Sequence, residues 1–144
     1  MSENEKETRK KRIDKKLKDA GWIIIANKDV NNYSYLEYHA VEEYPTDTGP
    51  ADYALFVKGN LLGFVEAKKV SVGVSNVLEQ AKRYSLGANE TIGLWDIYKT
   101  PFLYSSNGEV VYFLDVKNEL NISRQIQHFH TPFALEEFLI GMTK

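Results

Sequence analysis

The 144-residue sequence predicts an α/β fold in which a mixed β-sheet is flanked by helices on both faces. Two short, nearly continuous apolar runs, residues 53–57 and 61–65, are typical of strands covered on both sides, and therefore of the middle of a sheet. Around them the signals run in the order helix, strands, helix, strands, helix. The length suits a single domain, so we expect residues 1–144 to form one unit, with disorder only in residues 1–5.

The first half of the chain opens with a predicted amphipathic helix over residues 3–20. Its apolar stripe contains Ile13, Leu17 and Ala20, and Gly21 ends it. Strands are predicted over residues 22–25 and 35–43, the second with rough alternation from Leu36 to Glu42. Residues 45–50 form a predicted loop that leads to the central runs.

The second half contains two further helices and a hairpin. Residues 76–79 have the spacing of a capping box, which predicts a helix that ends near residue 86. Asn107-Gly108, between residues 102–106 and 109–116, predicts a hairpin with a type I′ turn. Thr131-Pro132 supplies the cap and first-turn proline of a last helix.

Polar residues interrupt the apolar pattern at the open end of the central hairpin. Asp52 precedes the first run, and Glu66 and Lys68 follow the second. Lys58-Gly59-Asn60 predicts a three-residue turn, and counting back from it places Asp52 opposite Glu66. Opposed residues project from one face, and the period of two adds Lys68 to that face. The sequence therefore predicts that the three side chains converge.

This convergence depends on the length of the turn. The three-residue turn pairs Val57 with Leu61. A two-residue turn would shift the register by one and send Asp52 to the other face.

An aspartate opposite a glutamate, with a lysine nearby, suits metal-dependent hydrolysis of phosphodiesters. Two carboxylates can hold a divalent cation against the phosphate, and a lysine can position the attacking water or offset phosphorane charge. The chain has no cysteine and only three histidines, His39, His128 and His130. A site made mainly of carboxylates suits a hard cation such as Mg²⁺. The alternative is that Glu-x-Lys arises by chance on a strand.

The net charge of −2 and the isoelectric point near 5.9 do not mark a nucleic-acid binder. Basic residues nevertheless gather before residue 19, where the chain carries Lys6, Arg9, Lys10, Lys11, Arg12, Lys15, Lys16 and Lys18. This basic helix is either a phosphate contact or a solvated face. The sequence resembles neither a signal peptide nor a membrane span, so we expect a cytoplasmic protein without membrane contact.

The spacing Asp52-x13-Glu66-x-Lys68 resembles the signature of the PD-(D/E)XK nuclease superfamily. Within it, the chain resembles the N-terminal endonuclease domain of the restriction (R) subunit of type I restriction-modification enzymes. Pro50-Ala51-Asp52 departs from the Pro-Asp pair of the superfamily name. The other matching segments are Glu7-Thr8-Arg9, Ile13-Asp14, Ala20-Gly21-Trp22, Val65 to Lys69, Gln80 to Tyr84, Pro101 to Gly108 and Phe129 to Pro132.

The resemblance implies roles for the residues of the central hairpin. Asp52 and Glu66 would bind Mg²⁺ together with the carbonyl of Ala67, and Lys68 would be the catalytic lysine. Glu7 would be a further metal ligand from the first helix, or otherwise an exposed helix residue.

A second group of residues would contact DNA. Gln80 and Tyr84 are one helical turn apart and share a face. The resemblance directs that face to DNA, whereas the alternative makes Tyr84 a core aromatic. Lys82 and Arg83 would contact phosphates or water. For His130 we expect a core or capping role rather than catalysis.

The implied function is that of a type I site-specific deoxyribonuclease, a Mg²⁺-dependent endonuclease that cuts double-stranded DNA together with methylation and specificity subunits. ATP would serve only a motor domain, because the chain has no phosphate-binding Gly-x-x-x-x-Gly-Lys-Ser/Thr loop. We therefore expect either a fragment of an R subunit or a stand-alone relative. Two alternatives are a stand-alone repair or recombination nuclease, and a non-catalytic DNA-binding or assembly module with the same fold.

Overall fold

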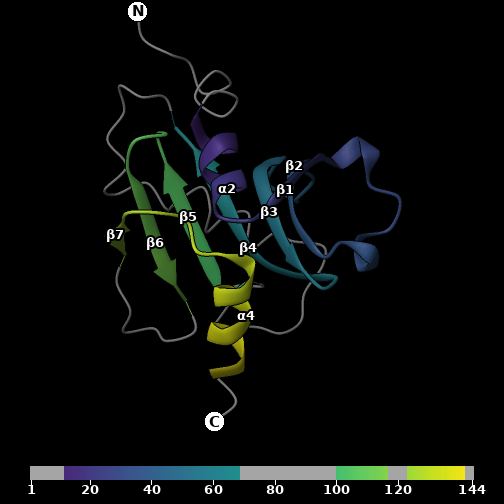
Figure 1. Cartoon of the computed structure of the whole chain (residues 1–144). Helices are drawn as coiled ribbons and strands as arrows, with labels where there is room; N and C mark the ends of the chain where they lie inside the picture. The colour runs from purple at the N-terminus through teal and green to yellow at the C-terminus, as the bar shows by residue number, and fades with distance from the viewer. Residues whose placement is uncertain (1–11, 69–99, 117–122, 142–144) are drawn as a thin grey trace, which may run out of the picture.

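The computed structural model describes residues 12–68, 100–116 and 123–141. These residues form one seven-stranded sheet, two α-helices and two short 3₁₀ helices (Figure 1). In chain order the elements are α2 (Asp14–Asp19), β1 (Ile23–Ala26), η2 (Asn27–Asp29), η3 (Tyr33–Tyr35), β2 (Tyr38–Tyr44), β3 (Ala51–Val57), β4 (Asn60–Ala67), β5 (Phe102–Ser106), β6 (Val111–Asp115), β7 (Arg124–Ile126) and α4 (Pro132–Gly141).

The sheet is mixed, and its strands lie side by side in the order in which they occur along the chain. Strands β1 and β2 are parallel, as are β4 and β5, and the other neighbours are antiparallel. The two apolar runs form β3 and β4 in the centre of the sheet, where all residues except Asp52 and Asn60 are buried. The prediction of a mixed sheet with a doubly covered central hairpin is confirmed.

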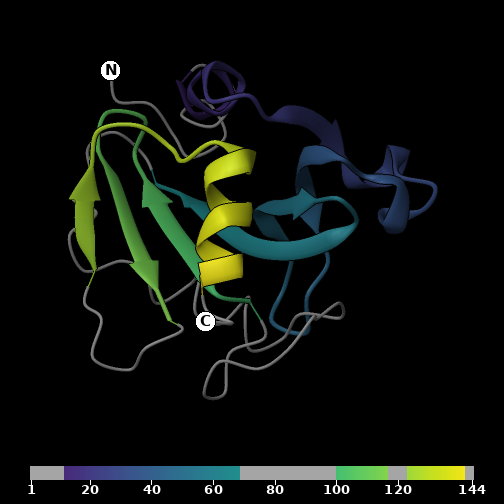
Figure 2. The ribbon, with the colours of Figure 1, turned by 60° about the horizontal axis from the view of Figure 1, so that its bottom comes forward.

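Each face of the sheet carries its own hydrophobic core. The first core joins Tyr53 and Val65 to Leu17 of α2 and Leu135 of α4, so both α-helices cover the same face (Figure 2). We call this side the helix face. The second core, on the opposite face, contains residues such as Phe64. The helix expected over residues 76–86, which would complete a sheet with helices on both faces, lies outside the described residues, as do residues 1–5.

The β3–β4 turn differs from the three-residue turn that the sequence predicts. Val57 pairs with Asn60, which leaves Lys58 and Gly59 as a two-residue turn. Both residues have positive φ, 50° and 81°, as a tight hairpin turn matched to the twist of its strands requires. The predicted turn was therefore wrong by one residue.

A β-bulge in β4 restores the register that the shorter turn would have shifted. Phe56 pairs with Leu61, but Leu55 pairs with Gly63, so Leu62 is an extra residue on β4. Beyond the bulge, Tyr53 pairs with Val65. The next residues along the two strands, Asp52 and Glu66, therefore oppose each other as predicted, although the reason is different.

The β5–β6 hairpin also lacks the predicted type I′ turn. Ser106 pairs with Val111, so four residues connect the strands. Gly108 has a positive φ of 90°, whereas Asn107 is not among the described residues with positive φ. Instead, Oδ1 of Asn107 accepts hydrogen bonds from the backbone N–H groups of Glu109 (2.9 Å) and Val110 (3.0 Å). The asparagine stabilises the loop through its side chain rather than through its backbone conformation.

Several element boundaries follow the local signals. Gly21 ends α2 with a φ of 99°, and Thr131 Oγ1 caps α4 by accepting a hydrogen bond from the N–H of Ala134 (3.0 Å). Strand β2 begins later than predicted because Tyr33–Tyr35 forms η3. Strand β7 was not predicted, since its three residues carry no apolar alternation.

Gly63 provides a test of the packing that fixes the central register. A Cβ at this position would lie 2.4 Å from the carbonyl oxygen of Phe102 on β5, and neither backbone can give way without breaking the sheet. We expect Gly63→Ala to lower the free energy of unfolding by about 1–3 kcal/mol, measured by urea denaturation. Gly49→Asn is the comparison: nothing lies within 4 Å of a Cβ there, so only the positive φ of 113° opposes the substitution, and the loss of stability should be smaller. An equal effect of both changes would contradict this packing constraint.

Candidate active site

The polar residues of the central hairpin lie on the face of the sheet opposite α2 and α4. On β3, Asp52 shares the face of Phe56, and on β4, Glu66 shares the face of Phe64, because side chains alternate along a strand. Both phenylalanines belong to the second core. The carboxylates therefore project from neighbouring strands of one face, away from the helix face.

Glu66 and Lys68 form a close ion pair at the end of β4. Glu66 is only 3% exposed, and Nζ of Lys68 lies 2.6 Å from Oε1 of Glu66. The backbone N–H of Lys68 donates to the carbonyl oxygen of Ser106 (2.8 Å), which extends the β4–β5 pairing beyond the last residue of the strand. Since a buried carboxylate is costly without a compensating charge, this lysine stabilises the ionised form of Glu66.

Asp52 reaches across to the same part of β4. It is half-buried, and its Oδ2 accepts a hydrogen bond of 2.8 Å from the backbone N–H of Ala67. The side chain of Asp52 is thereby held beside the peptide that links Glu66 to Ala67. The structure thus brings together Asp52, Glu66, Ala67 and Lys68, the four hairpin residues that the sequence singled out.

These donors have the chemistry of a magnesium site. Mg²⁺ prefers oxygen ligands, keeps several waters and is usually bound by only one or two carboxylates. Asp52 and Glu66 supply two such carboxylates from adjacent strands, and Asp52 is bonded to the N–H of Ala67, the residue whose carbonyl is the expected third ligand. Within residues 12–68, 100–116 and 123–141, no group of three or more histidine, aspartate or glutamate side chains could hold a metal ion. The pair therefore fits a partly hydrated cation rather than a cage made only of protein ligands.

The other candidate site residues lie outside the described residues. They are Glu7, the candidate ligand from the first helix, and the expected DNA contacts Gln80, Lys82, Arg83 and Tyr84.

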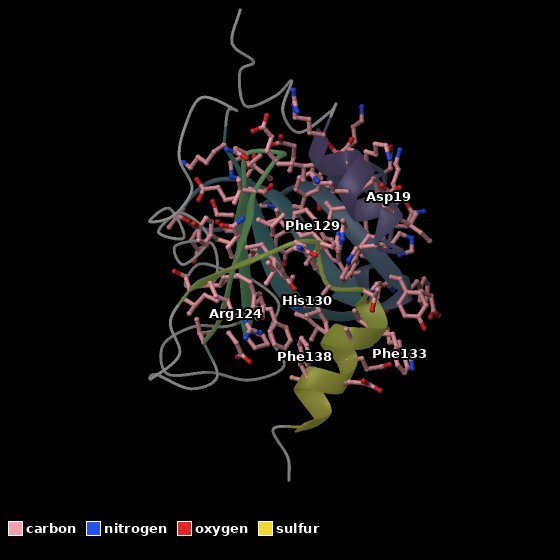
Figure 3. The ribbon with its side chains drawn as sticks, turned by 60° about the vertical axis from the view of Figure 1, so that its left-hand side comes forward. Asp19, Arg124, Phe129, His130, Phe133 and Phe138 are labelled. Carbon is pink, nitrogen blue, oxygen red and sulfur yellow. The ribbon has the colours of Figure 1, made fainter. Side chains whose placement is uncertain are left out.

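His130 has the core role that the sequence predicts. Its Nδ1 is hydrogen-bonded to the hydroxyl of Tyr104 (2.8 Å), and its carbonyl oxygen accepts from Nε1 of Trp22 (2.9 Å). Figure 3 shows the ring among aromatic side chains, with Phe138 close by; the ring centroids of these two residues are 5.1 Å apart. Burial, with a contribution from Arg124, lowers the pKa of His130. The half-buried imidazole packs against Tyr104 and Phe113 of the helix-face core.

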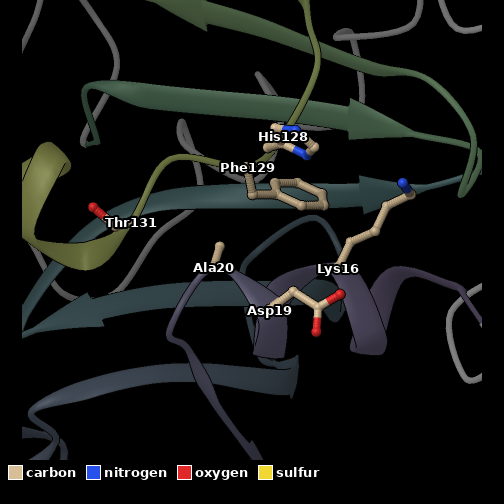
Figure 4. A pocket seen from close by; sticks show the side chains of 6 residues that line it. All are labelled: Lys16, Asp19, Ala20, His128, Phe129 and Thr131. Atoms are coloured by element: carbon tan, nitrogen blue, oxygen red, sulfur yellow. The ribbon is translucent and has the colours of Figure 1, made fainter.

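A separate cavity of about 330 Å³ lies between α2 and the segment that precedes α4 (Figure 4). Its charged and polar side chains are exposed, apart from the partly exposed Lys16, and the cavity is on the helix side of the sheet. The residues that line it are Lys16, Asp19, Ala20, His128, Phe129 and Thr131. It therefore shares no residue with the carboxylate pair.

Two polar residues acquire a role that the sequence analysis did not assign. Asp14 of α2 is buried and accepts a hydrogen bond from the hydroxyl of Tyr53, which ties the first described helix to the central strand. Ser105 of β5 lies directly beside Glu66 in the sheet. The available signal was a pair of serines at the end of a strand that begins with three aromatic or aliphatic residues, but the neighbour of Ser105 depends on the strand order.

Asp52 and Glu66 on paired central strands of a mixed sheet, with Lys68 two residues beyond Glu66, give the arrangement that the sequence predicts for a nuclease-like core. Residues 32–139 match the family model described as the second domain of the type I restriction enzyme EcoKI endonuclease subunit. The match covers more than half of the chain, and the chain belongs to this family.

Two further proteins are similar to this chain, one in sequence and one in fold. The chain is 25% identical to the type I restriction enzyme EcoKI endonuclease subunit of Escherichia coli K12, over 88% of the chain and 15% of that protein. It is also similar in fold to a fragment of a protein assigned as the HsdR subunit of a type I restriction enzyme from Vibrio vulnificus YJ016. That match has a TM-score of 0.66 and 23% identity, over 98% of the chain and 26% of the other. The chain therefore spans only a small part of these relatives.

Among the described residues, no helix is long and apolar enough to cross a membrane.

The burial of His130 predicts a pH dependence of stability. Its pKa is lowered in the folded state, so the unfolded chain binds the proton more readily below about pH 6.5. The stability that depends on neutral His130 is complete above that pH and is lost as the pH falls through the folded pKa. We expect His130→Gln to narrow the difference in melting temperature between pH 7.5 and pH 5.5.

His128→Gln is the matched control, because His128 is exposed and two residues away. It should leave the difference between the two pH values as it is in the original protein. His39, whose pKa burial also lowers, contributes equally to all three proteins and cancels in the comparison. An unchanged pH dependence in His130→Gln would contradict the burial of a neutral imidazole.

Proposed function

We propose that the chain is the Mg²⁺-dependent endonuclease region of a type I restriction R subunit and hydrolyses phosphodiester bonds of double-stranded DNA. Membership of the EcoKI endonuclease-subunit family supports the type of enzyme. The observation that carries the proposal is the contact between Lys68 and Glu66, beside Asp52 on the neighbouring strand. This combination supplies two metal-binding carboxylates and one cation at a single point of the sheet.

Each residue has a distinct task in this reaction. Asp52, Glu66 and the Ala67 carbonyl hold Mg²⁺, which when bound supplies positive charge against the phosphate oxygens. Lys68 bears a second positive charge at the edge of the carboxylates. Its ammonium group can donate a hydrogen bond to the attacking water and offset the negative charge that develops on the phosphorane. The hydrogen bond from Ala67 N–H to Asp52 orients that carboxylate in advance.

The remaining parts of the proposal rest on the resemblance. Gln80 and Tyr84 contact DNA from one helix face, Lys82 and Arg83 contact phosphates, and Glu7 adds a ligand from the first helix. The partners are double-stranded DNA and, through a longer R subunit, the methylation and specificity subunits. ATP serves the motor of that subunit, and the enzyme acts in the cytoplasm.

Replacing the lysine separates cleavage from the other activities of the enzyme. We expect Lys68→Ala to slow plasmid cleavage by the assembled type I enzyme about 10²–10³-fold, the cost of removing one preorganised electrostatic group. ATP hydrolysis should persist, because the motor lies elsewhere. Both rates are measured on the same preparation.

Lys58→Ala is the control for this experiment. Lys58 is also a lysine of the central hairpin, but it lies in the turn and pairs with Glu136 (3.0 Å), so both rates should be retained. Undiminished cutting by Lys68→Ala would refute its catalytic role. Loss of both activities would indicate an assembly function instead.

Removing one carboxylate charge tests the metal site itself. We expect Asp52→Asn to bind Mn²⁺, a probe with similar ligand preferences, at least about tenfold more weakly, as followed by electron paramagnetic resonance. The fold should survive, because the side-chain amide oxygen of the variant can still accept a hydrogen bond from the N–H of Ala67. Glu42→Gln is the control, since Glu42 is also buried but pairs with Tyr53 on the helix face. Equal Mn²⁺ binding by all three proteins would refute Asp52 as a ligand, whereas no binding by the original protein would favour a non-catalytic module.

A further inference from the structure

Ser105 carries a buried hydroxyl whose hydrogen-bonding capacity is unused. The residue is 0% exposed, and its Oγ has no hydrogen-bond partner within the part of the chain that the structure describes. Buried polar atoms are almost always paired in folded proteins, and an exception calls for a ligand, an ion or a water molecule. An alanine would fill the same position without leaving a donor unsatisfied.

The strand pairing places this hydroxyl next to the carboxylates. Ser105 of β5 is the direct partner of Glu66 in the parallel β4–β5 pair. On β5 it shares the face of Leu103, which belongs to the second core together with its own partner Phe64. Ser105 and Glu66 therefore project from the same face, with Asp52 on the other side of Glu66.

The next residue of β5, Ser106, is a buried serine whose hydroxyl has a hydrogen-bond partner. Ser106 is also 0% exposed, but it points to the opposite face, and its Oγ accepts a hydrogen bond from the N–H of Gly108 (3.0 Å). Its hydroxyl has a structural task in the β5–β6 loop. Ser105 has no such task among the described residues, and its position beside the candidate metal ligand is its distinguishing feature.

We propose that Ser105 is a positioning residue of the metal site. Its hydroxyl donates a hydrogen bond to the Glu66 carboxylate, directly or through one water molecule, when that carboxylate binds the cation. Lys68 contacts Glu66 from along β4, and Ser105 contacts it from β5, so two donors orient the ligand. Groups that hold a ligating carboxylate in this way typically raise metal affinity about 10–100-fold. This inference rests on the proposed metal-binding function.

The two serines form a matched pair for the test. In the full chain, Ser105→Ala should weaken Mn²⁺ binding at least about tenfold without lowering the melting temperature measured in the absence of metal, because no described hydrogen bond is lost. Ser106→Ala should show the opposite result: a lower melting temperature and unchanged Mn²⁺ affinity. A purely structural role of Ser105 would lower the melting temperature and leave the affinity of the folded protein unchanged.

Two further variants make the outcome decisive. Ser105→Cys nearly preserves the side-chain volume but replaces the hydroxyl by a weaker donor, so its Mn²⁺ affinity should also fall; an affinity equal to the original protein would overturn the inference. Glu66→Gln tests whether Glu66 is a ligand of the proposed metal site. If Glu66→Gln loses Mn²⁺ binding while Ser105→Ala retains it, only the role of Ser105 is refuted. If the original protein binds no Mn²⁺, both the metal site and the role of Ser105 are refuted.

Discussion

The register of the β3–β4 hairpin is the constraint on which the candidate site depends. A tight two-residue turn at Lys58 and Gly59 starts the pairing one residue out of step, and the extra residue Leu62 corrects it before the strands reach the polar end. A slip of one residue moves every side chain of a strand to the other face. Without the bulge, Asp52 and Glu66 would point in opposite directions, and the sheet would have no carboxylate pair.

Close packing holds this arrangement in place. Gly63 follows the bulge, and its lack of a side chain lets β4 approach the Phe102 carbonyl of β5. The adjacent parallel pair then continues past Glu66 and Ala67, each with a serine beside it. The same packing therefore aligns three strands, β3, β4 and β5, and brings their polar residues to a common point on one face.

The two faces of the sheet divide structural and chemical roles. On the helix face, polar groups are paired with each other: Tyr53 donates to Asp14, Tyr104 bonds to His130, and Trp22 donates to the His130 carbonyl. The first bond connects α2 to β3, and the other two connect the segment before α4 to β5 and to Trp22, which lies between α2 and β1. On the opposite face, Asp52 lies beside Glu66. The repulsion between these two carboxylates, and the cost of removing them from water, favour the binding of a cation. Lys68 supplies part of that compensation.

Much of this protein could be predicted from local patterns. Continuous apolar runs place β3 and β4 in the middle of the sheet, Gly21 ends α2, and Thr131 caps α4, because each of these features depends on neighbouring residues alone. The spacing of Asp52, Glu66 and Lys68, together with the family resemblance, was also sufficient to nominate a metal site. Each prediction draws on residues close in sequence or on a motif.

Tertiary structure decided the rest, because it depends on which strands become neighbours. The compensation between turn and bulge could not be predicted, since a two-residue turn and a bulge give the same final register as a three-residue turn. The sequence predicts that Asn107 contributes a positive φ to a tight turn, whereas in the structure its side chain accepts hydrogen bonds that stabilise the loop. Asparagine suits both roles equally. The place of Ser105 beside Glu66 required the parallel pairing of β4 with β5, two strands separated by 34 residues of chain, residues 68–101. Long-range pairing of this kind leaves no periodic signal in either strand.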